Sequence, residues 1–337
     1  MRVATPETDR GGWSRVQLGT WPTPLDPAPR LAQTLGLGPE DLWVKRDDLV
    51  GLGGGGNKVR KLEWLAGTAL ARGATTLVTS GALQSNHARL TAAAGARLGM
   101  DVVLILTGEP APEESGNLAL DGLLGARVVR AVGLDHVAAQ ALVEEVAAQL
   151  RQAGAQPAVI PLGGSSVLGA RGYVEAGREL LAQAPDLDVV VVAVGSGGTM
   201  AGLVHALGPE RVLGVDCGAI PQPAATVTEL VREMSHAVDE PELRLHLDQV
   251  GDGYDYMSQQ LADAIVITAR CEGILLDPIY TGRAMAGLIA AVRQGEIRPG
   301  RRVVFLHTGG LPGLFGHPAA MARARELLAD NAWSASH

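Results

Sequence analysis

Short runs of aliphatic and β-branched residues alternate with alanine-rich segments along most of the chain, and this alternation limits the fold more than any other feature. Several runs are continuously apolar, as in DVVVVAVGSGG (188–198), which suits strands covered on both faces. The predicted strands are 41–47, 75–81, 100–108, 126–132, 156–164, 188–198, 211–217 and 301–310. Helical segments such as 58–73 and 87–99 lie between them and close at glycine. The repeated order of strand and helix predicts an α/β protein with mostly parallel sheets covered by helices.

Length, charge and cysteine content narrow the class of protein. The 337 residues are about right for two domains with an active site between them, and the formal net charge is −8. The basic residues form no long run, so we expect no nucleic-acid partner. No apolar segment of about 18 residues occurs, which predicts a cytoplasmic protein without a membrane partner. Cys217 and Cys271 lack metal-ligand spacing, so we expect buried thiols, no disulfide and no metal.

Two glycine-rich loops follow predicted strands, GLGGGGNKVRK (51–61) and GSGGTMAG (195–202). Such loops bring backbone N–H groups close to an anion, and the next helix adds its positive end. The first loop is not a nucleotide-binding P-loop, because Asn57 separates its glycines from Lys58. The second has Met200 where a dinucleotide fingerprint needs its last glycine, yet Asp216 after the next strand keeps a nicotinamide-binding alternative open. A loop of this kind still holds a single phosphate.

Lys58 begins a predicted helix beside four consecutive glycines. Most lysines are solvated surface residues, but a lysine at such a place can form a Schiff base with a carbonyl cofactor. Lys61 lies one helical turn further along. It either supplies charge to a cofactor's phosphate or is an exposed helix charge.

Polar residues also follow a strand in TSGALQSNHARL (79–90). Ser85 can cap the next helix, with Asn86 and His87 simply lying in its first turn. In the catalytic alternative, the Ser85 hydroxyl meets the substrate and the Asn86 amide meets a cofactor oxygen. Tyr280 lies after a proline and before a glycine, a setting that presents a side chain at a loop tip or packs its ring in the core.

Six segments carry a resemblance to known enzymes. They are GGNKVRKLEWL, TSGALQSNHARLTAAAGARLG, IPLGGSSVLGARGYVEA, GSGGTMAGL, GILLDPIYTGRAMAGLI and FLHTGGLPGLFGH. Together they resemble the family of D-cysteine desulfhydrase and 1-aminocyclopropane-1-carboxylate deaminase, from about Pro22 to about His317. The resemblance implies pyridoxal 5′-phosphate as cofactor, a two-domain tryptophan-synthase-β-like fold of type II, and a homodimer. It also implies a large domain of residues 1–61 and 162–337 and a small α/β domain of residues 62–161.

The same resemblance implies roles for individual residues. Lys58 is similar to the Schiff-base lysine, Asn86 to the residue that meets the cofactor's phenolic oxygen, and Thr308 to the hydroxyl that faces the pyridine nitrogen. The implied phosphate cradle comprises Lys61, Gly195, Ser196, Gly197, Gly198 and Thr199. The residues implied at the substrate are Ser85, Asn86, His87, Tyr254 and Tyr280, and Ser85 and the two tyrosines join Lys58 as catalytic residues.

Thr281 bears on the choice between the two branches of this family. The resemblance implies glutamate after the equivalent of Tyr280 in the deaminases and threonine in the desulfhydrases. A carboxylate favours a protonated pyridinium and deep electron withdrawal, which helps to open a cyclopropane ring. If Thr281 and Thr308 face the ring nitrogen, the weaker electron sink suffices for a good leaving group on Cβ. The segment after Tyr254, DYMSQQLADAI, departs from the family pattern and leaves the exact substrate open.

The predicted activity is that of a carbon–sulfur lyase that converts D-cysteine to pyruvate, hydrogen sulfide and ammonia. Lys58 is expected to act as base at Cα, Tyr280 to assist the leaving group or bind the carboxylate, and Ser85 to position the carboxylate. Elimination from L-cysteate or other β-substituted alanines and deamination of the cyclopropane acid are alternatives within the family. From other classes, a nicotinamide oxidoreductase would use the 195–202 loop and Asp216, and a catalytically silent binding protein would need no lysine at position 58.

Overall fold

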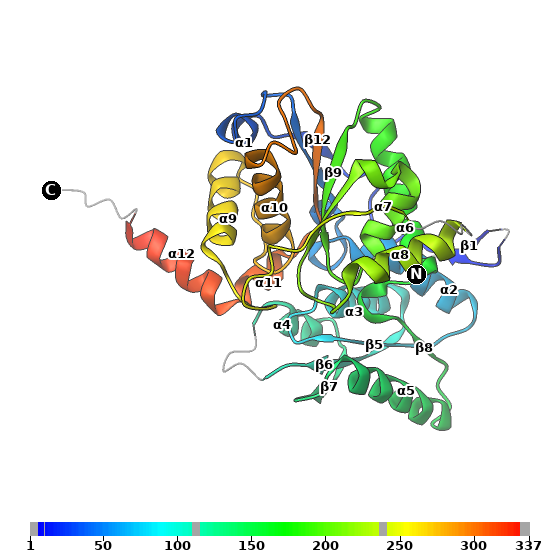
Figure 1. Ribbon diagram of the computed structural model, residues 1–337. Helices are drawn as coiled ribbons and strands as arrows, with labels where there is room; N and C mark the ends of the chain where they lie inside the picture. Colours follow the sequence, from blue (N-terminus) through cyan, green and yellow to red (C-terminus); the bar gives the residue numbers. More distant parts are fainter. Residues whose placement is uncertain (1–5, 10, 110–114, 236–240, 331–337) are drawn as a thin grey trace.

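Two β-sheets, each covered by helices, make up most of the molecule and lie one above the other in Figure 1. A computed structural model describes residues 6–9, 11–109, 115–235 and 241–330 of the chain. Both sheets are parallel except for one edge strand, which confirms the predicted α/β class. All strands of the smaller sheet come from residues 76–159, but the predicted domain boundaries at 61/62 and 161/162 stay a prediction.

The larger sheet has six strands, and its strands alternate their side chains between two helical layers. In spatial order the strands are β11 (Arg244–His246), β10 (Val212–Asp216), β9 (Val189–Val194), β12 (Val303–His307), β4 (Leu42–Arg46) and β3 (Leu25–Pro27). In β9, Val190 and Val192 pack toward one layer and Val191 toward the other, as the two-residue period of a strand requires. One layer comprises α6 (Val167–Gln183), α7 (Gly198–Leu207) and α8 (Pro223–Ser235). The opposite layer comprises α1 (Pro29–Thr34), α9 (Gln259–Glu272) and α10 (Thr281–Arg293) (Figure 1).

The smaller sheet has four parallel strands. Their order is β7 (Arg127–Ala131), β6 (Asp101–Thr107), β5 (Thr76–Ala82) and β8 (Pro157–Val159). The face toward the larger sheet is covered by α2 (Lys58–Ala71), α3 (Asn86–Leu98) and α4 (Gly116–Leu123), and the outer face by α5 (His136–Gln152) (Figure 1). Because α2 also packs on α6, it lies between the two sheets. Lys58, its first residue, is therefore placed where the two halves meet.

The remaining elements complete the described part of the chain. They are β1 (Glu7–Thr8), β2 (Ser14–Arg15), α11 (Leu311–Phe315), α12 (Pro318–Asp330) and the 3₁₀ helices η1 (Asp47–Leu49), η2 (Leu52–Gly54), η3 (Leu162–Gly164) and η4 (Pro209–Arg211). None of the helices in the described ranges combines the length and apolar character that a membrane crossing requires. Within the same ranges, no three His, Cys, Asp or Glu side chains gather as metal ligands would.

Each of the eight predicted strand segments contains a strand, and both predicted helices are found. The strand in 156–164 ends at Val159, with Leu162–Gly164 in η3, and the strand in 188–198 ends at Val194. Two further local expectations need correction. The proline-rich segment WPTPLDPAP (21–29) predicts an ordered loop, but Leu25–Pro27 forms the edge strand β3. An edge position tolerates Pro27, which has no N–H to donate to a neighbouring strand. Cys217 is buried as expected, whereas Cys271 is half-buried; both are free thiols.

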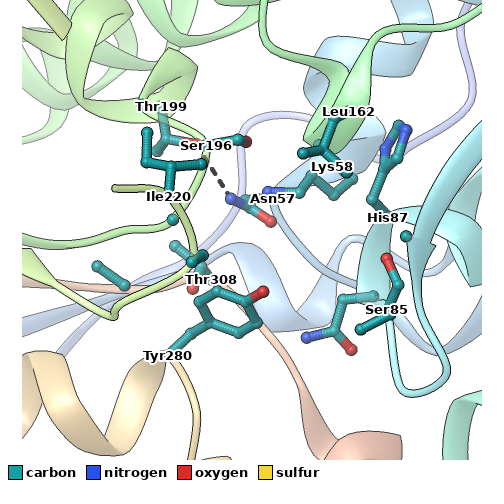
Figure 2. A pocket seen from close by; sticks show the side chains of 18 of the residues that line it. Asn57, Lys58, Ser85, His87, Leu162, Ser196, Thr199, Ile220, Tyr280 and Thr308 are labelled. Carbon is teal, nitrogen blue, oxygen red and sulfur yellow. Dashed lines mark hydrogen bonds between the residues drawn. The ribbon is translucent and has the colours of Figure 1, made fainter. Parts of the chain in front are cut away.

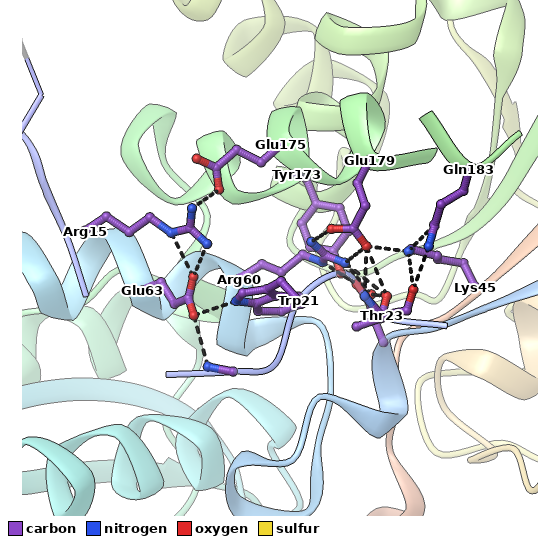
Figure 3. Close-up of polar contacts among 12 residues, drawn as sticks. Arg15, Trp21, Thr23, Lys45, Arg60, Glu63, Tyr173, Glu175, Glu179 and Gln183 are labelled. Carbon is purple, nitrogen blue, oxygen red and sulfur yellow. Dashed lines mark hydrogen bonds and ion pairs between the residues drawn. The ribbon is translucent and has the colours of Figure 1, made fainter. Parts of the chain in front are cut away.

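A cluster of buried charges joins β4, α2 and α6 and includes Arg60, two residues after the first residue of α2 (Figure 3). The Arg60 guanidinium donates to both carboxylate oxygens of Asp47 at 2.9 and 2.8 Å and to Glu179 at 3.0 Å. Tyr173 donates to Asp47 at 2.5 Å, and Lys45 forms an ion pair with Glu179. We call this set the Asp47 cluster. Its charges are paired and hydrogen-bonded, which is the condition for holding ions away from water.

Candidate active site

A pocket of about 280 Å³ opens where strand ends of both sheets meet the start of α2 (Figure 2). The larger sheet contributes the loops after β9, β10 and β12, and the smaller sheet those after β5, β6 and β8. Ligands of open α/β folds bind at the carboxyl ends of their strands, so this is the expected place for a site. Its lining residues are Asn57, Lys58, Lys61, Gly81, Ala82, Ser85, Asn86, His87, Thr107, Gly108, Leu162, Gly163, Ala193, Gly195, Ser196, Gly197, Thr199, Met200, Gly218, Ala219, Ile220, Tyr254, Tyr280 and Thr308.

The glycines before Lys58 let the backbone of this loop pack closer to the backbone of Asp48 than a residue with a side chain could. Gly53 to Gly56 all have positive φ, between 51° and 132°. A Cβ atom on Gly55 would lie 1.8 Å from the carbonyl oxygen of Asp48. The loop therefore folds against η1 and delivers Lys58 to the pocket as the first residue of α2. Burial lowers the pKa of the Lys58 amine to about 8.

Lys58 also differs from the other lysines of the chain in its surroundings. The chain has three lysines, Lys45, Lys58 and Lys61. Lys45 is fully buried and paired with Glu179 in the Asp47 cluster. Lys61 is fully buried and donates to Gly163 O at 3.3 Å and Ser165 Oγ at 3.1 Å. Only Lys58 combines a half-buried side chain with a place in the pocket wall.

The loop after β9 and the side chain of Lys61 lie against one another at the pocket. Gly197 has φ +84°, and α7 begins at the next residue with its N-terminus toward the pocket. A Cβ on Gly198 would lie 3.1 Å from Lys61 Nζ, so the glycine lets the amine lie against the loop. Lys61 is thus not an exposed helix charge. Burial, and then the nearby Lys58, lower its pKa well below the ordinary value.

Ser85, Asn86 and His87 lie at the start of α3 and all three line the pocket. Figure 2 shows Ser85 and His87 at its wall. Ser85 Oγ accepts from Ala88 N–H at 3.1 Å, so it caps the helix while facing the pocket. His87 Nε2 lies 3.0 Å from Thr79 Oγ1, whose own proton goes to Ile160 O. Nε2 therefore carries a proton and donates, and burial lowers the pKa of His87 well below its ordinary value. The ring is neutral.

Tyr254 and Tyr280 come from separate loops and meet at one side of the pocket. Their hydroxyl oxygens lie 2.6 Å apart, and their rings pack edge to face at 6.2 Å between centroids. Burial raises the pKa of both phenols, so both remain protonated at neutral pH. One hydroxyl donates to the other, which leaves one proton free for a ligand.

Thr308 and Thr281 occupy different environments, which corrects one expectation. Thr308 follows β12 and lines the pocket, and its carbonyl accepts from Asn57 N–H at 3.0 Å. Thr281 is fully buried outside the pocket lining, and its hydroxyl lies 2.6 Å from Asp277 Oδ1 and 2.8 Å from Asp277 N. The expectation that both hydroxyls face the pyridine ring is wrong for Thr281, because its hydroxyl is hydrogen-bonded to Asp277 at the start of α10.

Every other predicted site residue except Gly198 lines the pocket, and Gly198 flanks it between two lining residues. The sequence reasoning missed Asn57, whose amide donates to Thr199 Oγ1 at 3.1 Å, and the Leu162 and Ile220 loops (Figure 2). Leu162 precedes the pair of glycines at 163–164 after β8, a glycine signal that could have revealed this loop. Asp216, which the nicotinamide-binding alternative needs at the site, lies outside the pocket lining and accepts from Gly218 N–H at 3.0 Å.

Comparison with known proteins decides the family. A family described as "Pyridoxal-phosphate dependent enzyme" matches residues 16–309. The chain belongs to this family. A Pyrococcus furiosus protein named "Putative 1-aminocyclopropane-1-carboxylate deaminase" is 39% identical over 316 residues, covering 89% of this chain and 93% of its own. A D-cysteine desulfhydrase of Klebsiella pneumoniae is 40% identical over 321 residues, covering 90% and 96%.

Two solved structures share the fold of this chain. The crystal structure of an ACC deaminase homologue has a TM-score of 0.84 at 37% identity, over 92% of this chain and 96% of its own. The processed form of threonine deaminase isoform 2 from Solanum lycopersicum has a TM-score of 0.60 at 19% identity, over 92% of this chain and 84% of its own, which shows the shared fold alone. The fold of type II that the sequence resemblance implied is thereby confirmed.

The pocket fits the phosphate-bearing aldehyde that defines the family. In the described part of the chain, neither Lys58 nor Lys61 forms an ion pair with a carboxylate, so two adjacent amines lie at the pocket without a negative partner. A phosphate beside Lys61 and the start of α7 would supply that charge. Lys58, with its lowered pKa, is the amine suited to bond an aldehyde carbon.

Proposed function

We propose that the protein is a lyase that removes the Cβ substituent of a small amino acid, with D-cysteine as its substrate. Water is consumed, and the products are pyruvate, hydrogen sulfide and ammonia. The relatives named D-cysteine desulfhydrase support this substrate class, and the chain's membership of the pyridoxal-phosphate-dependent family supports the chemistry. We also propose the roles given above to Lys58, Lys61, Ser85, Asn86 and Thr308, and the expected homodimer and cytoplasmic location stay predictions.

One observation carries the choice of reaction. Among the described residues, no carboxylate lines the pocket; its polar side chains are amines, amides, hydroxyls and an imidazole. A carboxylate beside the ring nitrogen would hold that nitrogen protonated and deepen electron withdrawal from the substrate. A neutral hydroxyl such as that of Thr308 gives a weaker sink. This favours substrates whose Cβ carries a good leaving group over a strained ring of carbon atoms.

The mechanism follows from what the chain's own residues offer. When bound, pyridoxal phosphate draws electron density from the substrate Cα. The Lys58 amine accepts the Cα proton, since its lowered pKa leaves a neutral fraction near pH 8. The free proton of the Tyr254–Tyr280 pair goes to the sulfur that departs from Cβ, or holds the substrate carboxylate. Ser85, fixed by its helix cap, orients the carboxylate from the opposite side of the pocket.

A substrate panel tests the proposal. Purified protein is offered D-cysteine, L-cysteine, L-cysteate, β-chloroalanine and the cyclopropane acid, and keto-acid release is measured. We expect turnover of D-cysteine and β-chloroalanine, and turnover of the cyclopropane acid at least about 100-fold slower, since about 3 kcal/mol of lost transition-state stabilisation gives that factor. Lys58→Ala is the control and should release no keto acid. Comparable turnover of the cyclopropane acid would assign the chain to the deaminase branch, in line with its relatives of that name.

A further inference from the structure

Hydrogen bonds from Asn117 and Arg89 fix the orientation of the Asn86 side-chain amide. Its Oδ1 accepts from Asn117 Nδ2 at 2.9 Å and from Arg89 Nη2 at 3.4 Å. Asn117 lies on α4, 31 residues after Asn86 in the chain, and its side chain is fully buried. No hydrogen bond to another described residue involves Asn86 Nδ2, although Asn86 lines the pocket.

The direction of every amide in this network is fixed by groups that can act in one way only. Arg89 Nε donates to Asn117 Oδ1 at 3.0 Å, and a guanidinium has no acceptor. The other end of the Asn117 amide must then be NH₂, and it donates to the carbonyl of Gln84 at 2.9 Å as well as to Asn86. The atom of Asn86 that faces Asn117 is consequently oxygen, which turns its NH₂ toward the pocket.

Arg89 holds this network to the loop that carries Lys58. It is fully buried, and its Nη1 donates to the carbonyl of Gly55 at 3.0 Å and to that of Gly53. Because Arg89 lies one turn after Asn86 on α3, a single guanidinium joins the start of α3 to the glycine run before α2. Asn86 and Lys58 are therefore fixed relative to one another.

We propose that Asn117, held by Arg89, is a positioning residue that presents the Asn86 NH₂ as a hydrogen-bond donor to the oxygen of the ligand bound beside Lys58. The proposal rests on the cofactor contact proposed for Asn86 under the function above. It adds the residue that selects donor over acceptor at that contact. Asn117 touches neither substrate nor cofactor, since it lies outside the pocket lining.

The test exchanges one atom. Asn117→Asp keeps the bond from Arg89 but replaces the donor that faces Asn86 by an oxygen, so the Asn86 amide should turn its oxygen to the pocket. A donor stabilises the ionised phenolic oxygen of pyridoxal phosphate, the form that absorbs in the visible. We expect a lower ratio of visible to near-ultraviolet absorbance of the bound cofactor, and about tenfold weaker cofactor binding. Asn117→Ala removes the donor without adding a charge and should change the ratio in the same direction.

A double-mutant cycle separates positioning from a general structural effect. In an Asn86→Ala background, Asn117→Asp should cause no further change in the absorbance ratio. Leu123→Ala is the control on the same helix, because Leu123 is 83% exposed, and it should leave the ratio unchanged. Equal changes in both backgrounds, or a wild-type spectrum in Asn117→Asp or in Asn86→Ala, would overturn the proposal. No amino-acid substrate is used, so a failure to turn over D-cysteine would count against the proposed function alone.

Discussion

Lys58 combines two properties that a reactive amine needs, accessibility from a pocket and a reduced affinity for protons. The positive φ of the glycine run places it at the start of α2, and burial lowers its pKa to about 8. Lys45 and Lys61 are fully buried and bonded to protein oxygens. We therefore expect the three lysines to differ in reactivity because of their surroundings rather than their residue type.

Amine labelling of the cofactor-free protein should reveal this difference. Only the neutral amine reacts with an acylating reagent, so labelling of Lys58 should rise with pH through a midpoint near 8. Lys45 and Lys61 should stay unlabelled in the folded protein because both are fully buried. Peptide mass spectrometry over a pH series gives the midpoint. The matched control is the urea-unfolded chain, in which all three lysines should react with a midpoint of about 10.4; a Lys58 midpoint of that size in the folded protein would show that its pKa is not lowered.

At the scale of a single element, the start of α10 shows why Thr281 lies outside the pocket. Asp277 Oδ2 accepts from the N–H groups of Ile279 and Tyr280 at 3.0 and 2.9 Å, and Oδ1 accepts from Thr281 N–H at 2.9 Å. The Thr281 hydroxyl closes the arrangement on Asp277. One carboxylate thus satisfies three backbone donors at the helix start and fixes the direction of Tyr280.

Thr281→Val should consequently weaken the fold without changing the cofactor's environment. The variant keeps the shape of the side chain but loses its two contacts with Asp277, and we expect a loss of about 1–2 kcal/mol in the free energy of unfolding. Urea unfolding measures that loss, and the absorbance spectrum of the bound cofactor should match the wild type. Thr308→Val is the comparison, because Thr308 lines the pocket and its loss should alter the spectrum. A spectral change in Thr281→Val would show that the Thr281 hydroxyl does affect the cofactor ring, contrary to this prediction.

Across the whole molecule, the sequence predicted what depends on local patterns. Continuous apolar runs such as that of β9 and the glycines around Lys58 are such patterns, and both the strands and the loops were found. β3 and β11 were missed because their sequences, LDP and RLH, contain charged residues and proline and form no apolar run. β8 also has three residues at a sheet edge, but it lies in the apolar run PAVIP and was found. The burial of Lys61 could not be read from its neighbours along α2, since the loop that covers it comes from residues 163–165.

Of the two threonines that the family resemblance placed at the pyridine ring, one lies at the pocket and the other does not. Thr308 lies in the pocket as implied, whereas Thr281 is held by a carboxylate four residues earlier in the chain. That carboxylate was visible in the segment DPIYT, but its preference for the helix start over the pocket is settled only by packing. The network that orients Asn86 needs Asn117, from a helix that no motif joins to α3. Long-range contacts of this kind leave no mark on a single sequence.

The Asp47 cluster connects β4 and α6 of the larger-sheet layers with α2, which also covers the smaller sheet (Figure 3). Its disruption should therefore lower the free energy of unfolding of the whole chain. Burial acts to raise the pKa of Asp47, but Arg60 and hydrogen bonds from Arg60, Tyr173 and Thr23 outweigh it, and the pKa lies below its ordinary value. A carboxyl group with a lowered pKa stabilises the fold above the pKa of the unfolded chain. That stability is lost as the pH falls through the folded value.

Asp47→Asn should therefore lower the free energy of unfolding by about 3–5 kcal/mol at pH 7, because it leaves the buried Arg60 with Glu179 alone. The deficit relative to wild type should be constant above about pH 5 and shrink below about pH 4, as the wild-type carboxylate itself becomes protonated. Urea unfolding of the cofactor-free protein over a pH series measures both effects without the added stability of a bound ligand. Asp26→Asn is the matched control: Asp26 pairs with Arg46 at 3.1 Å, but 45% of its side chain is exposed, so its loss should cost less than about 1 kcal/mol. Equal losses for the two variants, or a deficit for Asp47→Asn that does not narrow in acid, would mean that the paired charge of Asp47 is not what holds β4, α2 and α6 together.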